Sequence, residues 1–383
     1  MKSIGSIWAY PALLVAAAFI VTAAAEASTI SVGPGQSIQA AVNAASAGDR
    51  IEVEGGSYRE SLNITKPVVL AGKGLPLLDS GSIGPALALR ADGIVVSGFD
   101  IRSTRQTGIR VLSHNNVIRN NTIRGCLDGV RLEHAGRNSI VENDINNNTN
   151  GINLVYSNRN AIDNNSIRDN NINEESDCGI FLAYSGENAI RYNNLSENGD
   201  CSISLRASCS NTILGNVASN NDWYGISLED GSDGNSLAEN ILCENKASGA
   251  YLDSSRKNLL IKNAASDNSN GISLDYDSND NVLAGNNVSN NQKGLHIANH
   301  SSNNTLRDNT AMKNGYGIYL TFSAGWNLIF GNHLIDNGCN AYDKGLTNNW
   351  DNGTIGNYYS DLGKIFYVPG GPSVDRYPRA EAS

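Results

Sequence analysis

Apolar and polar residues alternate along most of this chain in a unit that recurs every 22 to 24 residues, with one longer step of 28 residues. Each unit opens with a glycine and two apolar residues separated by one residue, as in Gly225-Ile226-Ser227-Leu228 and Gly271-Ile272-Ser273-Leu274. Two further aliphatic positions follow, each two residues after an asparagine. Alternation with a period of two predicts strands, and no stretch keeps the period of a helix over several turns. Each unit therefore predicts three short strands joined by turns.

Asparagine recurs at three positions in each unit, five residues apart. The second column begins at Asn121 and the third at Asn148. The first column contains Asn116, Asn138, Asn160, Asn188, Asn211, Asn235, Asn258, Asn281, Asn304 and Asn327. Asparagine tolerates the left-handed backbone of a sharp bend, and identical amides stacked coil on coil bond to one another in a ladder. A fixed period in this range predicts a solenoid, so we expect an all-β fold, a single-stranded right-handed parallel β-helix.

The chain divides into four parts by the regularity of this repeat. Residues 28–107 are expected to form an N-terminal cap and the first irregular coils, with a short helix near residues 37–46 that covers the open end of the core. Residues 108–337 carry ten regular coils. Residues 338–383 lose the repeat and are expected to form an irregular C-terminal cap.

The first 27 residues have the features of a secretory signal peptide. Lys2 supplies the positive charge, an apolar run extends from Leu13 to Val21, and Ala25-Glu26-Ala27 has the pattern of a cleavage site. This predicts a secreted, periplasmic or cell-surface protein. The alternative is an uncleaved anchor, in which case the protein contacts the membrane through this segment. The formal net charge of −10 and the scattered lysines and arginines disfavour nucleic acid as a partner.

Six cysteines in an exported chain permit disulfides. Cys178 and Cys201 occupy the same point of consecutive units. At the normal strand spacing of about 4.8 Å, their Cα atoms fall inside the range that a disulfide spans. We therefore predict a Cys178–Cys201 disulfide.

Candidate chemistry lies on the outward positions of the glycine-led strands. Four successive units place groups capable of acid–base work on a sugar at these positions, namely Asp253, Asp275, His296 and Tyr319. Residues expected to contact carbohydrate nearby are Tyr156, Tyr184, Glu229, Tyr251, Tyr276 and Asp277. An outward sheet face must be polar in any case, so a chance set of surface residues is the competing interpretation.

Two metal sites are conceivable from the sequence. Copper favours clustered histidine, methionine or cysteine, and His296 and His300 are the nearest approach to such a cluster in sequence. Ordinary surface histidines are the favoured interpretation of this pair. Calcium favours oxygen ligands, which are dense in the segment from Asp275 to Asp280. That segment lacks the glycine and the closing glutamate of an EF-hand loop, so a solvated turn is favoured there.

The chain resembles the NosD-like proteins of the carbohydrate-binding and sugar-hydrolase (CASH) type of β-helix. The similar segments are Val32-Gly33-Pro34-Gly35-Gln36-Ser37-Ile38, Trp350-Asp351-Asn352-Gly353, Gly356-Asn357-Tyr358-Tyr359-Ser360-Asp361 and Val374-Asp375-Arg376-Tyr377-Pro378. The tail motifs look like those of archaeal NosD-like surface proteins. The resemblance implies a parallel β-helix, and for the named family member a periplasmic role with an ABC transporter in maturing a copper site.

Three functions remain open from the sequence. The favoured expectation is a non-catalytic rod of the cell envelope that binds a polysaccharide, another envelope glycan or a partner protein. The first alternative is a NosD-like accessory protein in copper delivery with ABC transporter subunits. The second is a polysaccharide lyase, epimerase or glycoside hydrolase that uses the outward face of one sheet.

Overall fold

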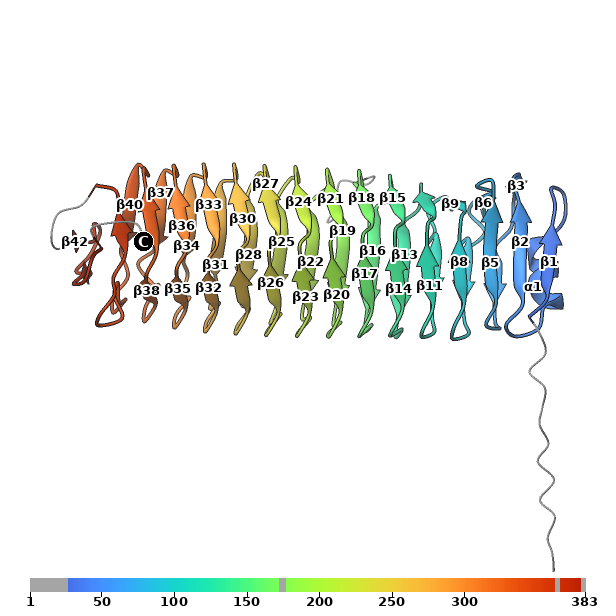
Figure 1. Ribbon diagram of the computed structural model, residues 1–383, viewed down its shortest axis with the longest axis horizontal. Helices are drawn as coiled ribbons and strands as arrows, with labels where there is room; N and C mark the ends of the chain where they lie inside the picture. The colour runs from blue at the N-terminus through green and yellow to red at the C-terminus, as the bar shows by residue number, and fades with distance from the viewer. Residues whose placement is uncertain (1–26, 172–176, 362–365, 380–383) are drawn as a thin grey trace, which may run out of the picture.

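The computed structural model describes residues 27–171, 177–361 and 366–379 as a stack of coils that share three parallel sheets (Figure 1). Each coil contributes one strand to each sheet, and neighbouring coils pair in parallel. The expected right-handed parallel β-helix of about 14 coils is confirmed. The predicted signal peptide lies outside the described residues, apart from Ala27. No described helix is long and apolar enough to cross a membrane.

Sheet A contains 14 short strands. They are β1 (Thr29–Val32), β2 (Arg50–Glu54), β5 (Val69–Lys73), β8 (Val95–Ser97), β11 (Val117–Arg119), β14 (Ser139–Val141), β17 (Ala161–Asp163), β20 (Ala189–Arg191), β23 (Thr212–Leu214), β26 (Ser236–Ala238), β29 (Leu259–Ile261), β32 (Val282–Ala284), β35 (Thr305–Arg307) and β38 (Leu328–Phe330).

Sheet B also contains 14 strands. They are β3 (Ser57–Tyr58), β6 (Leu77–Asp79), β9 (Asp100–Arg102), β12 (Thr122–Arg124), β15 (Asp144–Asn146), β18 (Ser166–Arg168), β21 (Asn194–Ser196), β24 (Val217–Ser219), β27 (Ile241–Cys243), β30 (Ala264–Ser266), β33 (Asn287–Ser289), β36 (Thr310–Met312), β39 (His333–Ile335) and β41 (Tyr358–Tyr359).

Sheet C contains 13 strands, including the longest of the molecule. They are β4 (Leu62–Ile64), β7 (Leu87–Leu89), β10 (Ile109–Val111), β13 (Asp128–Glu133), β16 (Asn150–Val155), β19 (Cys178–Ala183), β22 (Cys201–Arg206), β25 (Tyr224–Glu229), β28 (Ser248–Asp253), β31 (Asn270–Asp275), β34 (Lys293–Ile297), β37 (Tyr316–Leu320) and β40 (Cys339–Asp343).

The core is a column of aliphatic side chains from all three sheets. Ile118, Ile140 and Ile162 lie in register in sheet A, and each is completely buried. Inward residues alternate with outward ones along every strand, as the pleat requires. The N-terminal end of this column is covered by α1 (Ile38–Ala44), which buries Ile38 and Val42 and is capped by the Ser37 side chain. Covering the end removes an exposed apolar surface and strand edge.

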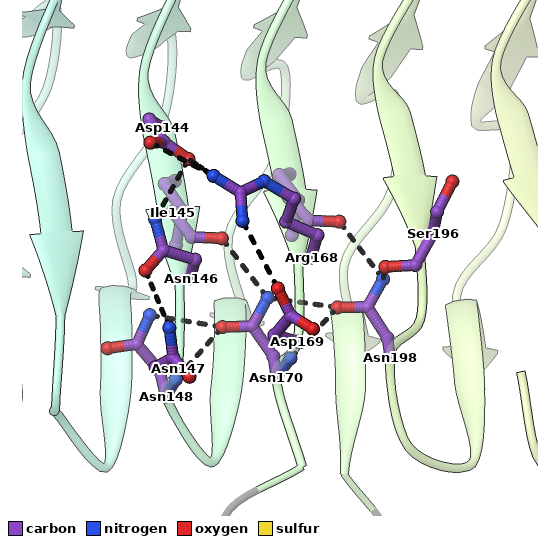
Figure 2. Close-up of polar contacts among 11 residues, drawn as sticks. Asp144, Ile145, Asn146, Asn147, Asn148, Arg168, Asp169, Asn170, Ser196 and Asn198 are labelled. Carbon is purple, nitrogen blue, oxygen red and sulfur yellow. Dashed lines mark hydrogen bonds and ion pairs between the residues drawn. The ribbon is translucent and has the colours of Figure 1, made fainter.

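The asparagine columns form continuous hydrogen-bonded ladders inside the turns. In the third ladder the side-chain nitrogen of Asn148 donates to the Asn170 side chain at 3.0 Å, and Asn170 donates to Asn198 at 2.9 Å (Figure 2). On the surface beside this ladder, Arg168 lies within 3.4 Å of Asp144 and 3.2 Å of Asp169 (Figure 2). Each amide also bonds backbone groups of the preceding coil, which satisfies buried polar atoms that would otherwise be costly.

The reason given above for the asparagines is partly wrong. The left-handed residue of each bend is the one before the ladder asparagine, for example Arg137 before Asn138 and Glu142 before Asn143, with φ of 56° and 55°. The asparagine itself turns its amide into the bend. Its oxygen accepts the backbone N–H of the asparagine one coil earlier, as between Asn138 and Asn116 at 2.9 Å. The column therefore selects asparagine for its two-sided amide rather than for its backbone freedom.

A fourth ladder, of serines, was missed from the sequence. Its hydroxyls follow the end of the sheet C strands and accept the backbone N–H of the serine one coil earlier, at 3.0 Å between Ser157 and Ser185 and at 3.1 Å between Ser208 and Ser232. The buried members are Ser157, Ser185, Ser208, Ser232, Ser255, Ser278 and Ser301. Serine is common in exposed turns as well, so its column does not stand out from composition alone.

The repeat does not end at residue 337 as predicted. Strand β40 extends sheet C and β41 extends sheet B. Asn348 and Asn357 extend the first two ladders, accepting from Asn327 at 3.1 Å and from Asn332 at 2.8 Å. These steps span 21 and 25 residues, so the period is lost although the coil continues. A short antiparallel pair, β42 (Phe366–Tyr367) and β43 (Val374–Asp375), follows beyond the stack.

A buried carboxylate organises the C-terminal end. Asp343 accepts hydrogen bonds from the Gly345 backbone at 2.7 Å, from Asn348 at 3.0 Å, from the Trp350 indole at 2.9 Å and from the Ser373 hydroxyl at 2.7 Å. Trp350 itself is fully buried against the core. Asp343 therefore joins the last strand of sheet C to the segments that close the stack.

Candidate functional site

The outward face of sheet C is the broadest regular surface of the molecule. Its strands from β13 to β31 are six residues long, whereas most strands of sheets A and B have three. Alternation therefore places three outward side chains on each coil: the residue before the glycine, and the second and fourth residues after it. Parallel pairing stacks equivalent residues into columns about 4.8 Å apart.

Aromatic and ionisable side chains gather on this face from β25 to β40. We call the set the sheet C strip. It comprises Tyr224, Glu229, Tyr251, Asp253, Asp275, Lys293, His296, Tyr316, Tyr319 and Tyr342. All come from successive coils, so the regular stacking of the fold positions them.

Tyrosine rings pack against one another along the strip. The rings of Tyr224 and Tyr251 are parallel within 3° with centroids 4.5 Å apart. Tyr319 and Tyr342 are parallel within 5° at 5.2 Å, and Tyr316 meets Tyr319 edge to face at 5.0 Å. The Lys293 ammonium lies 5.0 Å from the centre of the Tyr319 ring, in cation–π geometry. The strip therefore offers flat apolar surfaces whose hydroxyl groups remain polar.

Partly buried carboxylates occupy the column beside these rings. Asp253 and Asp275 are direct neighbours in the register of β28 and β31, and Glu229 lies one coil before Asp253. Burial raises the pKa of Glu229 and of Asp275 above the usual carboxyl range, and the negative charge of Asp253 adds to both shifts. Burial also raises the pKa of Tyr224 to about 12. The column therefore holds protons more tightly than exposed carboxyls do.

His296 is held neutral at pH 7 by its surroundings. Its Nδ1 lies 3.0 Å from the Ser273 hydroxyl, and its ring centre is 5.7 Å from that of Tyr319. Burial, helped by the charge of Lys293, lowers the pKa of His296 to about 4. The pKa of Lys293 is lowered by burial as well, while Asp275 opposes that shift.

The predicted site residues separate into two groups. Six lie on the strip: Glu229, Tyr251, Asp253, Asp275, His296 and Tyr319. The four acid–base candidates among them occupy two adjacent columns, because Asp253 and Asp275 are fourth after their glycines while His296 and Tyr319 are second. The other four, Tyr156, Tyr184, Tyr276 and Asp277, lie in the turns after the sheet C strands.

The turn residues form a ridge beside the strip. His134, Tyr156 and Tyr184 stack with ring centres 5.2 and 5.0 Å apart, and both tyrosines are about half exposed. Tyr276 occupies the equivalent turn four coils further along, so it does not join this stack. The predicted stacking residues are therefore exposed aromatic groups, but they do not converge on the acid–base candidates.

Several residues of this face were missed from the sequence. Tyr224, Lys293 and Tyr316 precede their glycines, at an outward position that strict alternation could have identified. Next to Tyr224, a pocket of about 400 Å³ opens over β16, β19, β22 and β25. Phe181 and Trp223 are part of its lining. No sequence signal marks this pocket, because its lining comes from four coils.

The two cysteines expected to form a disulfide are free. Cys178 and Cys201 are buried and lie in register in β19 and β22, as their spacing predicts, but no bond joins them. The neighbouring Cys201 thiol and burial raise the pKa of Cys178 well above its usual value. Disulfide formation requires a thiolate, so this environment keeps Cys178 in the unreactive form.

The described residues do not build a multi-ligand metal centre. No group of three or more histidine, cysteine, aspartate or glutamate side chains lies together among them. His296 points along the strip, whereas His300 is exposed in the turn that follows β34. Near the proposed calcium segment, Asp275 accepts from the Tyr276 backbone and Asn279 accepts from Ser302. Copper sites with three or four such ligands therefore do not fit this part of the chain.

His296 predicts a specific pH dependence of stability. Its pKa is about 4 in the folded protein and about 6.5 when unfolded. Between these values the unfolded chain binds more protons, so the contribution of His296 is complete above about pH 6.5 and is lost as the pH falls toward 4. We expect urea denaturation of the wild type to lose about 2 kcal/mol more than His296→Gln between pH 7 and 4. His300→Gln is the control and should follow the wild type; equal pH profiles for all three proteins would contradict the prediction.

Comparisons with known proteins place this geometry in context. The mannuronan C-5 epimerase AlgE4 A-module of Azotobacter vinelandii superimposes with a TM-score of 0.58 at 15% identity, covering 81% of this chain and 94% of that one. XylC in complex with xylose gives a TM-score of 0.54 at 10% identity, covering 74% and 75%. At these identities the likeness shows the fold alone. No curated protein sequence matches significantly.

The family relationship rests on sequence. The profile described as "Periplasmic copper-binding protein (NosD)" matches residues 78–251 and 230–363, which together include most of the regular coils and the start of the tail. The match includes all of the sheet C strip and the pocket beside it. The chain belongs to the NosD family of parallel β-helix proteins.

Proposed function

We propose that this protein is an exported rod that binds polysaccharide along the sheet C strip without catalysing a reaction. The observation that carries the proposal is the line of packed tyrosine rings from Tyr224 to Tyr342, accompanied by partly buried carboxylates. Membership of a family described as periplasmic supports the location outside the cytoplasm.

The chemistry of the strip suits a sugar chain. Sugar rings have an apolar face that packs on an aromatic ring and a rim of hydroxyls that needs hydrogen-bond acceptors. The parallel pair Tyr224–Tyr251 and the pair Tyr319–Tyr342 supply such faces at two separated places along the axis. Between them, Asp253 and Asp275 supply acceptors. A linear glycan lying along the helix axis would meet these groups in turn.

Removal of the packed rings should weaken polysaccharide binding. We expect Tyr251→Ala and Tyr319→Ala each to raise the dissociation constant for a retained polysaccharide about tenfold, a loss of about 1.4 kcal/mol. The measurement is affinity electrophoresis of the mature protein in gels that contain single neutral or acidic polysaccharides. Tyr192→Ala is the matched control, because Tyr192 is exposed in a turn between sheets A and B. Equal retention of all three variants, or no retention of the wild type by any polymer, would refute the proposal.

A second candidate function is acid–base catalysis on the bound glycan. The observation that favours it is the pairing of Asp275, whose pKa is raised by burial, with the nearby neutral His296. A lyase would release an unsaturated sugar, which is detected by its ultraviolet absorbance during the same polysaccharide screen. Product that appears with the wild type and disappears in Asp275→Asn or His296→Ala would replace the binding proposal with an enzyme.

A third candidate function is copper delivery with an ABC transporter. The family description is the observation that favours it. Retention of copper by the purified protein through exhaustive dialysis, without retention of any polysaccharide, would favour this function over the other two.

A further inference from the structure

The pocket beside the strip has its own recognition chemistry. Its volume of about 400 Å³ lies within the range of roughly 300–1,000 Å³ that is usual for small-molecule sites. Phe181, Trp223 and Tyr224 supply aromatic surface, while Asn153, Ser204 and Glu229 supply polar groups. The exposed rings of the ridge, in contrast, border a smaller pocket of about 280 Å³.

Trp223 is an exposed indole on a fixed backbone. Its side chain is 55% exposed, which is unusual for so large an apolar group. Its backbone N–H donates to Asp200 at 3.1 Å, and its carbonyl accepts from Ala247 at 2.9 Å, so both neighbouring coils hold it. The ring lies 6.2 Å from that of Tyr224, which stacks in turn on Tyr251. The pocket is therefore joined to the sheet C strip by continuous aromatic surface.

Asn153 presents a buried acceptor without a partner. Only 8% of this residue is exposed. Its side-chain nitrogen donates to Asp128 at 3.1 Å on the N-terminal side, but its side-chain oxygen has no hydrogen-bond partner. An unsatisfied buried acceptor costs about 1–3 kcal/mol, so the site gains from a ligand hydroxyl that donates to this oxygen. Asn153 lines the pocket.

The charges of the pocket disfavour an acidic ligand. The lining cation is Arg206, whose guanidinium lies 3.7 Å from Glu229 and 3.2 Å from Asp230. Arg206 is thus already paired with carboxylates of the protein. A uronate would bring a further negative charge next to Glu229 and Asp200, whereas a neutral sugar brings only hydroxyls.

We infer that this pocket is a subsite for one neutral sugar unit, which stacks on Trp223 and donates a hydroxyl hydrogen bond to Asn153. The inference rests on the proposed function and narrows its substrate to glycans that carry a neutral sugar at an end or a branch. It also assigns the first coils of the face, from β16 to β25, a role distinct from that of the strip.

Tryptophan fluorescence tests the inference directly. The mature protein is titrated with four neutral disaccharides (cellobiose, maltose, xylobiose and mannobiose) and with digalacturonate. We expect a saturable change in emission with at least one neutral disaccharide, at least tenfold weaker binding of digalacturonate, and loss of the signal in Trp223→Phe. Trp326→Phe is the matched control, since Trp326 is 66% exposed far along the stack. Asn153→Ala should weaken binding about tenfold by removing the acceptor, with circular dichroism checking its fold.

The outcomes separate the subsite from the strip. A signal that persists in Trp223→Phe, equal affinity for digalacturonate, or no response to any neutral disaccharide would overturn the subsite. If gels still retain the wild type but not Tyr251→Ala in that case, the proposed binding along the strip stands alone. A response to a neutral disaccharide without retention by any polymer would support the subsite and refute the strip.

Discussion

Replacing Asn240 with alanine should destabilise the protein by about 3 kcal/mol or more. Asn240 is fully buried in the middle of the second ladder. Its side-chain oxygen accepts from the backbone and side chain of Asn216 at 3.0 and 3.1 Å, and its nitrogen donates to Ile213 at 3.0 Å and Asn263 at 2.9 Å. Alanine leaves these buried donors and acceptors unpaired on both neighbouring coils, and each unpaired group costs about 1–3 kcal/mol.

Asn258→Ala provides the matched control within the ladders. Asn258 is equally buried and accepts from Asn235 at 2.7 and 3.2 Å, but its own side-chain nitrogen has no partner. Its replacement therefore breaks two hydrogen bonds where Asn240→Ala breaks four. We expect a smaller loss, about half as large, in urea denaturation followed by circular dichroism. Equal losses would show that the donated bonds contribute nothing. Hydrogen exchange should locate the weakened coils around β24 and β27, because each coil depends on its neighbours.

Asp343→Ala should open the C-terminal end of the stack. Four donors lose their acceptor at once, including the indole of the buried Trp350 and the hydroxyl of Ser373. We expect a loss on the order of 4 kcal/mol, concentrated in the last coils. Release of the closing segments would expose the edges of β40 and β41, which are open to pairing with other chains. Increased hydrogen exchange over residues 339–361 and concentration-dependent oligomers in light scattering are the expected readouts.

Lys344→Ala distinguishes this effect from general disturbance of the tail. Lys344 follows Asp343 but is exposed, and its ammonium lies 5.6 Å from the Tyr342 ring. Its replacement should leave exchange and oligomeric state unchanged. Monomeric Asp343→Ala with wild-type exchange would mean that Trp350 holds the end by apolar packing alone.

The columns of the repeat made the fold predictable, while the site depended on their sideways arrangement. Asn138 and its equivalents recur at a constant interval, and a constant interval permits only a stack of coils. The alternation around Ile140 and Ile162 then fixed which residues enter the core. At the tail the same coil persists with steps of 21 and 25 residues, and Asn348 and Asn357 were not recognised.

The site residues show where prediction from the sequence stops. Glu229, Asp253 and Asp275 could be placed on one face because they share a position relative to their glycines. Tyr156 and Tyr184 were placed with them, but the chain bends into the left-handed region at these residues and carries them onto the ridge. Cys178 and Cys201 were placed correctly as neighbours, yet burial and mutual contact keep them as thiols.

The sequence by itself determined the coil, the three strands per coil, the buried columns and the family, since each follows from the identity and spacing of residues along the chain. The tertiary structure alone decided the ionisation of His296, the unpaired oxygen of Asn153 and the pocket beside Trp223. These properties depend on how four or more coils crowd one another and exclude water. A repeat pattern repeats positions, but burial and partners differ from coil to coil according to the side chains above and below.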